Sequence, residues 1–524
     1  MSRRLRMMLP LALSAAAALA ADPPPVRGEV DLAVSLDPRP LAELDADAVA
    51  VPIFDGEELA TALGSASATA SPAVAAAARL GLLPAKRFEI LPLVAPQGFR
   101  AASLWLVPAG ASDGLDAERL RRFAGAAVQE LRRHEVGSLT LFLRGGVPGE
   151  AAAGAAVEGA LMGLFDAGIH KTDGRRSRMA SLRLAGIADT PGARAAVERA
   201  RGRGRAVNFA RSLAVEPANY VYPEVLAEHA RALAREAGLE VEVLDETAIQ
   251  RRGFGGVWAV GKGGGNPPRV IVLRYRAPVP SAVTLALVGK GVCFDSGGLS
   301  LKPGENMYEM KADMAGGAAV LAAMKMIAAE RPGVNVLGVV AAVENMPDGR
   351  AQRPGDVFVG YSGKTVEVLS TDAEGRLILS DALAYAVEQG ATHLVDIATL
   401  TGTVIRALGD HRAGAFASDE RLYAALERAA ARTGERFWRL PIDEEHGEGI
   451  EKSLVADLNE TGGKAGASVG AHFLRAFTGG RPWIHLDIAG VAWPDDKVSY
   501  RDKGPTGAPA RTLAELAHAL AETD

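Results

Sequence analysis

The chain has 524 residues, of which 48% are hydrophobic and 23% charged, so it can bury a large core and is not a disordered chain. At about 150 residues per domain, this length predicts two or three domains. The formal net charge of −5 gives no reason to expect a nucleic acid as partner. A single cysteine, Cys293, excludes an intrachain disulfide, and its apolar neighbours favour a core residue over a nucleophile.

The N-terminus has the pattern of a secretory signal. Arg3, Arg4 and Arg6 precede an apolar stretch, residues 7–21, that ends in small side chains. A stretch of about 15 residues is too short to span a bilayer. We therefore expect a signal peptide over residues 1–21, export to the periplasm or the medium, and no membrane span. The alternative is a start codon placed upstream of a cytoplasmic protein.

Residues 28–190 are expected to form a small α/β domain. Short apolar runs at 30–34, 48–53 and 138–143 alternate with Ala-rich helical stretches, and no cluster of catalytic side chains occurs among them. A helical, Arg-rich stretch over about 191–213 then leads into the second half. Its basic run, Glu198–Arg205, is interpreted as a solvated helix end rather than a nucleic-acid patch.

Strands and helices alternate through residues 191–524, which we expect to form the catalytic domain. This order predicts a central, largely parallel sheet flanked by helices, in which ligands bind beyond the carboxyl ends of the strands. The predicted strands are 283–288, 334–343, 366–369, 393–397 and 484–488, and the predicted helices are 312–330, 377–388, 468–477 and 511–523.

Charged residues gather in two Gly-rich segments of this second half. The segments are V-G-K-G-V-C-F-D-S-G-G-L-S-L-K-P (288–303), leading to M-K-A-D-M (310–314), and S-T-D-A-E-G-R-L (370–377). Four carboxylates and one lysine amine can hold two divalent cations, and four acids nearly balance two dications in charge. A lone Asp is more often a helix cap or loop acid, but four in this arrangement favour a metal site. The residues are Lys290, Asp295, Lys302, Asp313, Asp372, Glu374 and Arg376.

The three cationic side chains are expected to differ in role. Lysine ligates a metal only as the neutral amine, so the pKa of Lys290 has to fall through burial and neighbouring cations. Lys302 and Arg376 remain cationic and suit a developing oxyanion. No histidine lies in either segment, and no G-x-S-x-G occurs, which disfavours a His-ligated zinc site and a Ser-His-Asp triad. The segment Gly256–Gly263 imitates a phosphate loop, but Gly263 stands where that loop needs Ser or Thr, and the run Gly261–Gly265 is expected to be a turn.

At these residues the chain resembles the leucyl aminopeptidase family of metallopeptidases. Ser370–Leu377 is similar to the hallmark N-T-D-A-E-G-R-L of that family. The resemblance runs from about Val207 to the C-terminus and is looser before residue 190. It includes the blocks Asn345–Pro347, Arg353–Asp356, Asp396–Gly402, Trp438–Pro441 and His485–Gly490.

The resemblance implies an enzyme that removes one N-terminal residue, preferably apolar and Leu-like, from peptides with a free N-terminus. One metal would be held by Lys290, Asp295, Asp313 and Glu374, and the other by Asp295, Asp372 and Glu374, with zinc, manganese or both as the ions. A water bridging the metals would be the nucleophile.

Further roles follow from the same resemblance. Lys302 would polarise the scissile carbonyl, and Arg376 would anchor a bicarbonate ion as general base. Met310 and Thr399 would line the specificity pocket. The resemblance also implies a homohexamer and, for most relatives, a cytoplasmic location.

The sequence departs from the family pattern at one site position, and two alternative functions also have to be considered. Ser370 stands where the hallmark has Asn, which puts substrate affinity in question but not metal binding. A different two-metal hydrolase, such as a phosphoesterase, is disfavoured by Lys290 as ligand. A non-catalytic or DNA-binding member of the same family is disfavoured by the net charge.

Overall fold

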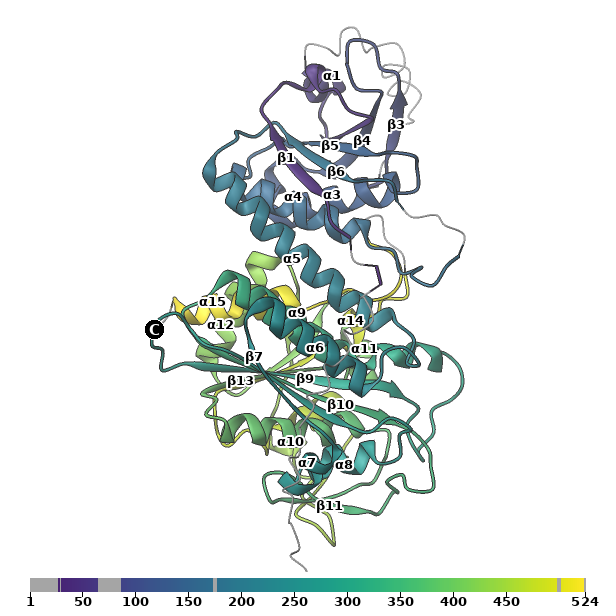
Figure 1. Ribbon diagram of the computed structural model, residues 1–524, viewed down its shortest axis with the longest axis vertical. Helices are drawn as coiled ribbons and strands as arrows, with labels where there is room; N and C mark the ends of the chain where they lie inside the picture. The colour runs from purple at the N-terminus through teal and green to yellow at the C-terminus, as the bar shows by residue number, and fades with distance from the viewer. Residues whose placement is uncertain (1–26, 29, 65–85, 173–176, 497–500, 523–524) are drawn as a thin grey trace, which may run out of the picture.

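The computed structural model describes residues 27–28, 30–64, 86–172, 177–496 and 501–522. The predicted signal peptide, residues 1–21, lies outside them and stays a prediction. Two sheets, each covered by helices, lie one above the other along the long axis of the molecule (Figure 1). Helix α5 (Pro191–Val215) runs from the upper sheet to the lower one, as the Arg-rich stretch predicted. Its first turn is set by Pro191 and by Thr190, whose side chain accepts the Ala193 N–H.

The N-terminal half contains a sheet of six described strands in the order β1-β6-β5-β2-β4-β3. All its pairs are parallel except β3–β4. Helices α3 and α4 pack on it around a core of small and apolar side chains, so the predicted α/β character is confirmed. The elements are β1 (Ala33–Asp37), β2 (Ala48–Phe54), α1 (Leu59–Leu63), β3 (Leu91–Val94), β4 (Ser103–Gly110), α3 (Ala117–Leu131), β5 (Ser138–Phe142), α4 (Gly149–Leu164) and β6 (Ser181–Ala185).

The second half contains a sheet of eight described strands in the order β15-β14-β17-β13-β9-β10-β8-β7. The central strands β17, β13, β9 and β10 are parallel, which confirms the predicted class, whereas β7, β8 and β14 pair antiparallel towards the edges. The strands are β7 (Glu240–Leu244), β8 (Arg269–Tyr275), β9 (Thr284–Asp295), β10 (Asn335–Asn345), β13 (His393–Ala398), β14 (Ala413–Ala417), β15 (Phe437–Arg439) and β17 (Trp483–Asp487).

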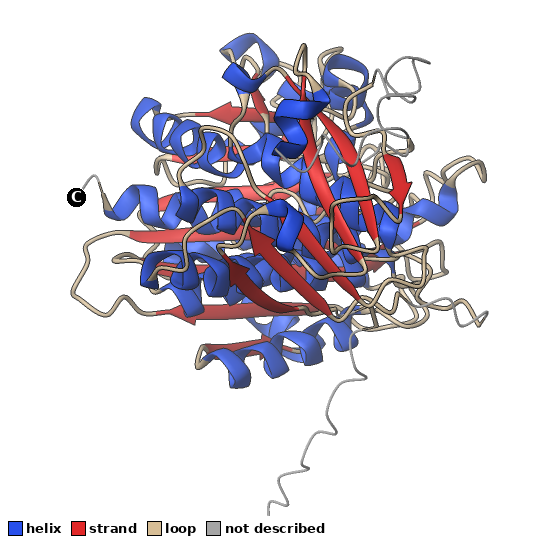
Figure 2. Ribbon diagram, turned by 90° about the horizontal axis from the view of Figure 1, so that it is seen from above, coloured by secondary structure: helices blue, strands red, loops and turns tan. Residues whose placement is uncertain are grey.

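Helices cover both faces of this sheet, and each face has its own hydrophobic core (Figure 2). Helices α5, α6, α9, α12 and α15 pack on one face, and α7, α8, α10 and α13 pack on the other. Their bounds are α6 (Pro223–Ala237), α7 (Glu246–Arg252), α8 (Gly255–Gly261), α9 (Ala315–Glu330), α10 (Glu374–Glu388), α11 (Gly402–Leu408), α12 (Glu420–Thr433), α13 (Gly466–Arg475), α14 (Ala489–Ala492) and α15 (Ala510–Ala521).

The apolar helical stretch Met307–Glu330 has the length and hydropathy of a membrane span. It is a core helix, because 83% of its most apolar window is buried in the protein. Its glycines allow close packing on β9: a Cβ on Gly289 would lie 2.6 Å from the Cα of Gly317. Cys293 on β9 is buried, and burial raises the pKa of its thiol, which confirms a core residue.

Four element boundaries near the charged segments differ from the sequence prediction. Strand β9 continues past Val288 to Asp295, because the Gly-flanked Lys290 is itself buried and does not end the strand. A 3₁₀ helix, η4 (Met307–Met314), precedes α9, so Asp313 lies before that helix and not at its start. Helix α10 begins at Glu374, three residues earlier than predicted.

The fourth difference concerns the predicted strand 366–369. It is the short strand β12 (Thr365–Glu367) of a separate sheet with β11 (Val357–Val359) and β16 (Leu458–Asn459), not part of the central sheet. The apolar run is too short to have identified its sheet from sequence. The predicted turn at Gly261–Gly265 follows the end of α8 and is confirmed.

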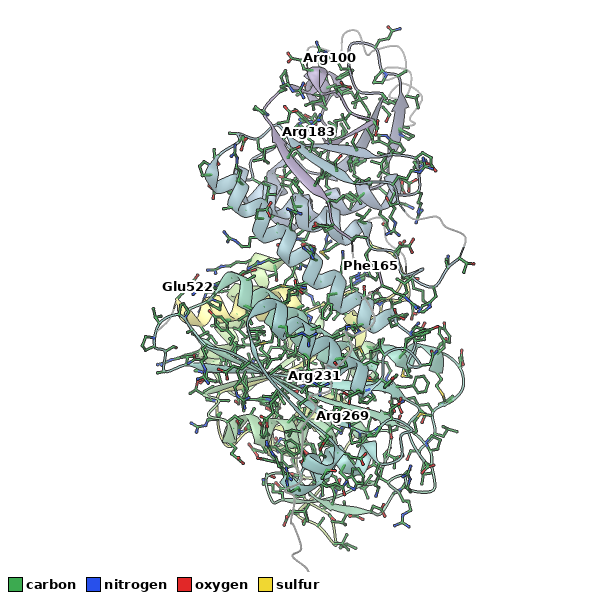
Figure 3. All side chains as sticks on the ribbon, in the orientation of Figure 1. Arg100, Phe165, Arg183, Arg231, Arg269 and Glu522 are labelled. Carbon is green, nitrogen blue, oxygen red and sulfur yellow. The ribbon has the colours of Figure 1, made fainter. Side chains whose placement is uncertain are left out.

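Buried ion pairs join the two halves of the molecule. Glu158 on α4 accepts hydrogen bonds from Arg121 on α3 at 2.8 Å and from Arg511 on α15 at 3.2 Å. Nearby, the guanidinium of Arg211 on α5 lies 4.0 Å above the ring of Phe165, which Figure 3 labels at the junction. A buried carboxylate that accepts hydrogen bonds from two arginines therefore lies at the junction of the two halves.

Replacement of Glu158 by Gln is expected to lower the free energy of unfolding by about 1–3 kcal/mol, the scale of weakening buried hydrogen bonds. The loss is partial because Arg121 keeps Glu118 at 2.5 Å and Arg511 keeps Glu435 at 3.4 Å. Burial acts to raise the pKa of Glu158, but Arg121 and Arg511 outweigh it and lower that pKa. The stabilisation is therefore present above the ordinary Glu pKa of about 4.3 and is lost as the pH falls through the lower folded pKa. Thermal unfolding at pH 7 and at pH 3 measures both effects.

The matched control is Glu198→Gln, since the Glu198 side chain is 68% exposed and pairs only at the surface. Equal melting temperatures for the two variants at pH 7 would contradict the account of the junction.

Candidate active site

The structure brings all seven charged residues of the two Gly-rich segments together. Lys290 lies within β9 and Asp295 is its last residue, while Asp313 lies in η4. Asp372 precedes α10, and Glu374 and Arg376 lie in its first turn. They meet because β9 and β10 end together, with Asp295 paired to Asn345, and because α10 starts at the same edge.

Three carboxylates form the centre of the site. Ligand oxygens of Asp295, Asp372 and Glu374 all lie within 4.8 Å of one another. Asp295 and Glu374 are buried, and Asp372 is exposed. The Oε2 atom of Glu374 has no hydrogen-bond partner among the described residues, which is costly for a buried oxygen. Clustered carboxylates with an unsatisfied oxygen suit a divalent cation.

The ammonium group of Lys302 lies between carboxylates of the two Gly-rich segments. Its Nζ lies 2.7 Å from Asp295 Oδ2 and 2.5 Å from Asp372 Oδ1. Burial acts to lower the pKa of Lys302, but Asp295 and Glu374 outweigh it and raise the pKa above its usual range. An ammonium is thus held where the carboxylates of both segments converge. The donor set fits two divalent ions in charge and in ligand type.

Lys290 occupies the inner side of the cluster. Its Nζ lies 2.7 Å from Asp313 Oδ2 and 2.8 Å from Glu374 Oε1, and it donates to the Thr399 carbonyl at 3.0 Å. The Thr399 hydroxyl donates to Asp313 Oδ1 at 2.6 Å. Gly375 leaves room for this lysine, because a Cβ there would lie 2.7 Å from its Cε.

The neutral amine expected of Lys290 requires neighbouring cations, because the protein groups act in the opposite direction. Burial acts to lower its pKa, yet the carboxylates of Asp313 and Glu374 outweigh burial and raise it above the usual range. The protein groups alone therefore favour the ammonium. Only cations competing for the same carboxylates reverse this balance and free the amine as a ligand.

Three carboxylates of the site, Asp313, Asp372 and Glu374, have raised pKa values. Burial, and then repulsion from Asp295, raise the pKa of Glu374, and burial raises the pKa of Asp372. Burial also raises the pKa of Asp313, against the attraction of Lys290. Such an arrangement is stable only while positive charges remain among the acids.

Asn345 is a site residue whose role sequence reasoning missed. Its Nδ2 donates to Asp295 Oδ1 at 2.8 Å and to the Thr371 carbonyl at 2.9 Å, so it links the two motifs. Thr371 completes the link: its hydroxyl donates to the Gly297 carbonyl at 2.6 Å and accepts the Ser300 N–H at 2.7 Å. Gly297 has φ +87°, and a Cβ there would lie 2.9 Å from Asp372 Oδ1. The sequence signal for this role was an Asn at the end of a predicted buried strand, at the edge where ligands bind.

Arg376 is buried beside the cluster. Its Nη1 donates to the backbone carbonyl of Glu460 at 2.6 Å, and its Nε has no hydrogen-bond partner among the described residues. Burial lowers the pKa of the guanidinium, against the attraction of Glu460 and Glu374. Ser370, at the position where the family hallmark has Asn, is half-buried, and its hydroxyl accepts the Asp372 N–H at 3.4 Å.

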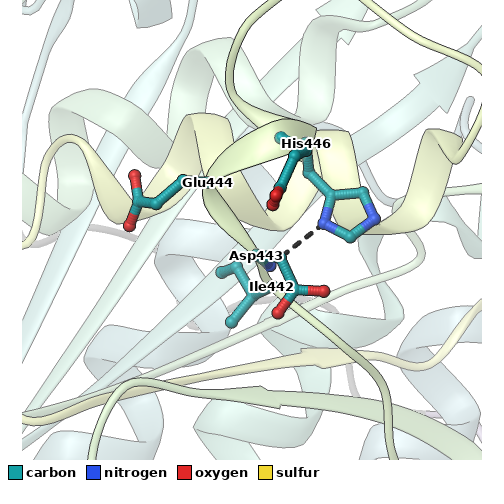
Figure 4. Close-up of a pocket in the computed structure, with 5 residues that line it drawn as sticks. Ile442, Asp443, Glu444 and His446 are labelled. Carbon is teal, nitrogen blue, oxygen red and sulfur yellow. Dashed lines mark hydrogen bonds between the residues drawn. The ribbon is translucent and has the colours of Figure 1, made fainter.

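A separate hollow of about 710 Å³ is lined by none of these residues (Figure 4). The Asp443 N–H donates to His446 Nδ1 at 3.0 Å, so that imidazole nitrogen is already used. The residues that line the hollow are Ile442, Asp443, Glu444, Glu445 and His446.

Acids clustered at the carboxyl ends of parallel strands, with two lysines and an arginine against them, define a metal-dependent hydrolase. The sequence matches the catalytic domain of the cytosol aminopeptidase family over residues 208–514 and the N-terminal domain of that family over residues 50–173.

Relatives and solved structures agree with these matches. A probable cytosol aminopeptidase of Solibacter usitatus is 46% identical and covers 92% of this chain and 98% of its own length. One from Koribacter versatilis is 40% identical with the same coverage. Among structures, a tomato leucine aminopeptidase mutant has a TM-score of 0.85 and 31% identity, covering 95% of this chain and 98% of its own. The bottromycin maturation enzyme BotP in complex with Mn has a TM-score of 0.80 and 35% identity, covering 91% and 100%. The chain belongs to the cytosol aminopeptidase family, and it is a metallo-aminopeptidase.

Replacement of Asp295 by Ala is expected to remove both metals and the activity, because Asp295 lies against both motifs and no other described side chain takes its place. Metal content after desalting, measured by plasma mass spectrometry, is expected to fall from about two ions per chain to fewer than one. Asp356→Ala, an acid paired with the exposed Arg353 on a surface loop, is the control. Retention of two ions by the Asp295 variant would refute its role.

Proposed function

We propose that this chain is a two-metal aminopeptidase that removes one residue, preferably apolar and Leu-like, from peptides with a free α-amine. The observation that carries the proposal is the convergence of Asp295, Asp372 and Glu374 within 4.8 Å, with Lys290 and Lys302 against them. No histidine takes part in that cluster as described. This donor set distinguishes the site from the His-ligated zinc centres of other peptidases.

Five residues would hold two divalent cations, manganese or zinc: Lys290, Asp295, Asp313, Asp372 and Glu374. The match to a structure solved in complex with Mn supports this choice of ion. When bound, the ions would supply Lewis-acid chemistry, polarising the scissile carbonyl and lowering the pKa of the attacking water. The exposed edge of the cluster, at Asp372, is where a substrate amine would arrive.

Lys302 and Arg376 would act on substrate and on the general base. The raised pKa of Lys302 keeps it charged at neutral pH, and its side chain is 22% exposed, so it is available to a developing oxyanion at the mouth of the site. Arg376 is a buried guanidinium whose Nε is unpaired among the described residues, which suits it to anchor a bicarbonate ion. The bicarbonate would serve as general base.

An apolar first residue is supported by exposed leucines on the same segments. Leu299 and Leu301 are 47% and 61% exposed and lie between Asp295 and Lys302 in the chain, and Leu369 is 44% exposed just before Asp372. Two further residues are expected to line the specificity pocket. Met310 lies on η4, and the hydroxyl of Thr399 donates to Asp313 Oδ1. An apolar side chain is the one that such surroundings would favour.

The assembly and the location of the protein are also proposals. The homohexamer and the predicted export of the chain rest on the sequence interpretation alone. The names of the relatives, cytosol aminopeptidases, support the cytoplasmic alternative.

The basic run on α5 does not favour nucleic acid. Arg203 pairs with Glu330 at 2.6 Å and with Glu515 at 2.8 Å, and Arg201 pairs with Asp31 at 2.9 Å. These guanidiniums are committed to carboxylates of the protein itself.

The proposal predicts that the enzyme releases Leu from a peptide with a free N-terminus, with Mn²⁺ or Zn²⁺ added, and not from the N-acetylated peptide. Chelator should abolish the release, and added metal should restore it. Chromatography of the products after equal incubation measures all four conditions. Equal cleavage of the acetylated peptide, or full activity in chelator, would sink the proposal.

Lys302→Ala is expected to reduce kcat by at least about 100-fold, the scale of losing one oxyanion donor, while metal content stays near two ions per chain. Lys262→Ala, a lysine in the turn after α8, is the control. Normal turnover by the Lys302 variant would show that its role is misassigned.

A further inference from the structure

Glu460 is a buried carboxylate outside the set of seven charged residues. It directly follows β16, and its exposed fraction is 0%. Its Oε1 accepts the Leu369 N–H at 2.8 Å and the Ser370 N–H at 2.5 Å, and its Oε2 accepts the Leu369 N–H at 2.9 Å. Both amides belong to the turn that leads to Asp372. The position arises from the parallel pairing of β12 with β16, in which Glu367 lies opposite Asn459.

The backbone of the same residue holds Arg376. The Glu460 carbonyl accepts the Arg376 Nη1–H at 2.6 Å. One residue thus contacts the start of the turn through its side chain and the far side of the turn through its main chain, with Asp372 and Glu374 between these two points.

The other side of the turn is held by a different part of the molecule. Thr371 bonds to Gly297 and Ser300, and its carbonyl accepts from Asn345. Those bonds join the turn to the end of β9, whereas the bonds of Glu460 join it to the small sheet. The turn therefore has hydrogen bonds to two separate parts of the molecule.

We propose that Glu460 is a positioning residue that fixes the 369–376 turn and Arg376 relative to the carboxylates on β9. A buried carboxylate is costly unless it is hydrogen-bonded, and hydrogen bonds from amides to an ionised acceptor are stronger than neutral ones. The interaction uses the N–H of Ser370 and not its side chain. It therefore holds the turn with Ser at the position where the family hallmark has Asn. The effect on turnover rests on the proposed function, but the effect on metal binding does not.

The test compares Glu460→Gln with Asp457→Asn. Asp457 accepts the Thr365 N–H at 2.8 Å at the other end of β12, so its variant disturbs the same small sheet without reaching the turn. Mn²⁺ is titrated into chelator-treated protein by calorimetry, and kcat and KM for a leucine anilide are measured at saturating Mn²⁺.

We expect Glu460→Gln to weaken the binding of at least one Mn²⁺ about tenfold and to lower kcat about tenfold, with KM within about threefold, the scale seen when partners of metal ligands are removed. The Asp457 variant is expected to stay within about twofold of wild type. Wild-type binding and turnover in the Glu460 variant would overturn the proposal, and so would equal losses in the two variants.

The experiment distinguishes failure of the proposed function from failure of the proposal for Glu460. If the wild type binds two Mn²⁺ but hydrolyses no anilide, the proposed function fails, and the binding titration still decides the role of Glu460. If the Glu460 variant does not fold, hydrogen exchange in the wild type decides instead. Slow exchange of the Leu369 and Ser370 amides supports the proposal, and exchange at the rate of an unprotected loop overturns it.

Discussion

The carboxylates of Asp295, Asp372 and Glu374 lie close enough to repel one another strongly. Burial adds to the repulsion, and both raise the pKa of Glu374. Positive charge has to be present among these acids for them to remain ionised. The lysines Lys290 and Lys302 supply it from the protein, each touching two carboxylates. The negative charge that holds the two lysines also attracts divalent cations. Ammonium groups and divalent cations therefore compete for the same carboxylates.

The fold holds these carboxylates close together through regular elements and hydrogen bonds. Asp295 ends a largely buried strand, and Glu374 begins a helix that packs on the opposite face of the sheet from α9. Asn345 and Glu460 then tie the intervening turn from two sides. Repelling groups would otherwise move apart, so these hydrogen bonds keep them within ligand distance.

Much of the site was accessible from the sequence, because residue type and spacing carry it. The seven charged residues and the strand–helix alternation identified the cluster. Strands β10, β13 and β17 were found within two residues, whereas β9 continues seven residues past its predicted end. The pairing of Lys290 with Asp313 and Glu374 was not accessible, since it depends on distances that only the fold sets. The separate sheet of β12 was missed for a related reason: three residues carry no signal of which strand they pair with. Glu460 binds backbone N–H groups, and such contacts leave no mark in a motif. Asn345 stands in a block of the family resemblance, but its bonds to Asp295 and Thr371 depend on the fold.

Location of the metals by anomalous diffraction tests the central claim most directly. Crystals of the full chain, grown after chelation and then soaked in Mn²⁺, should be measured near the manganese absorption edge. The account predicts two anomalous peaks per chain among Lys290, Asp295, Asp313, Asp372 and Glu374, with Lys302 displaced from Asp295. Peaks elsewhere, or no peak with Lys302 still paired to Asp295 and Asp372, would contradict it.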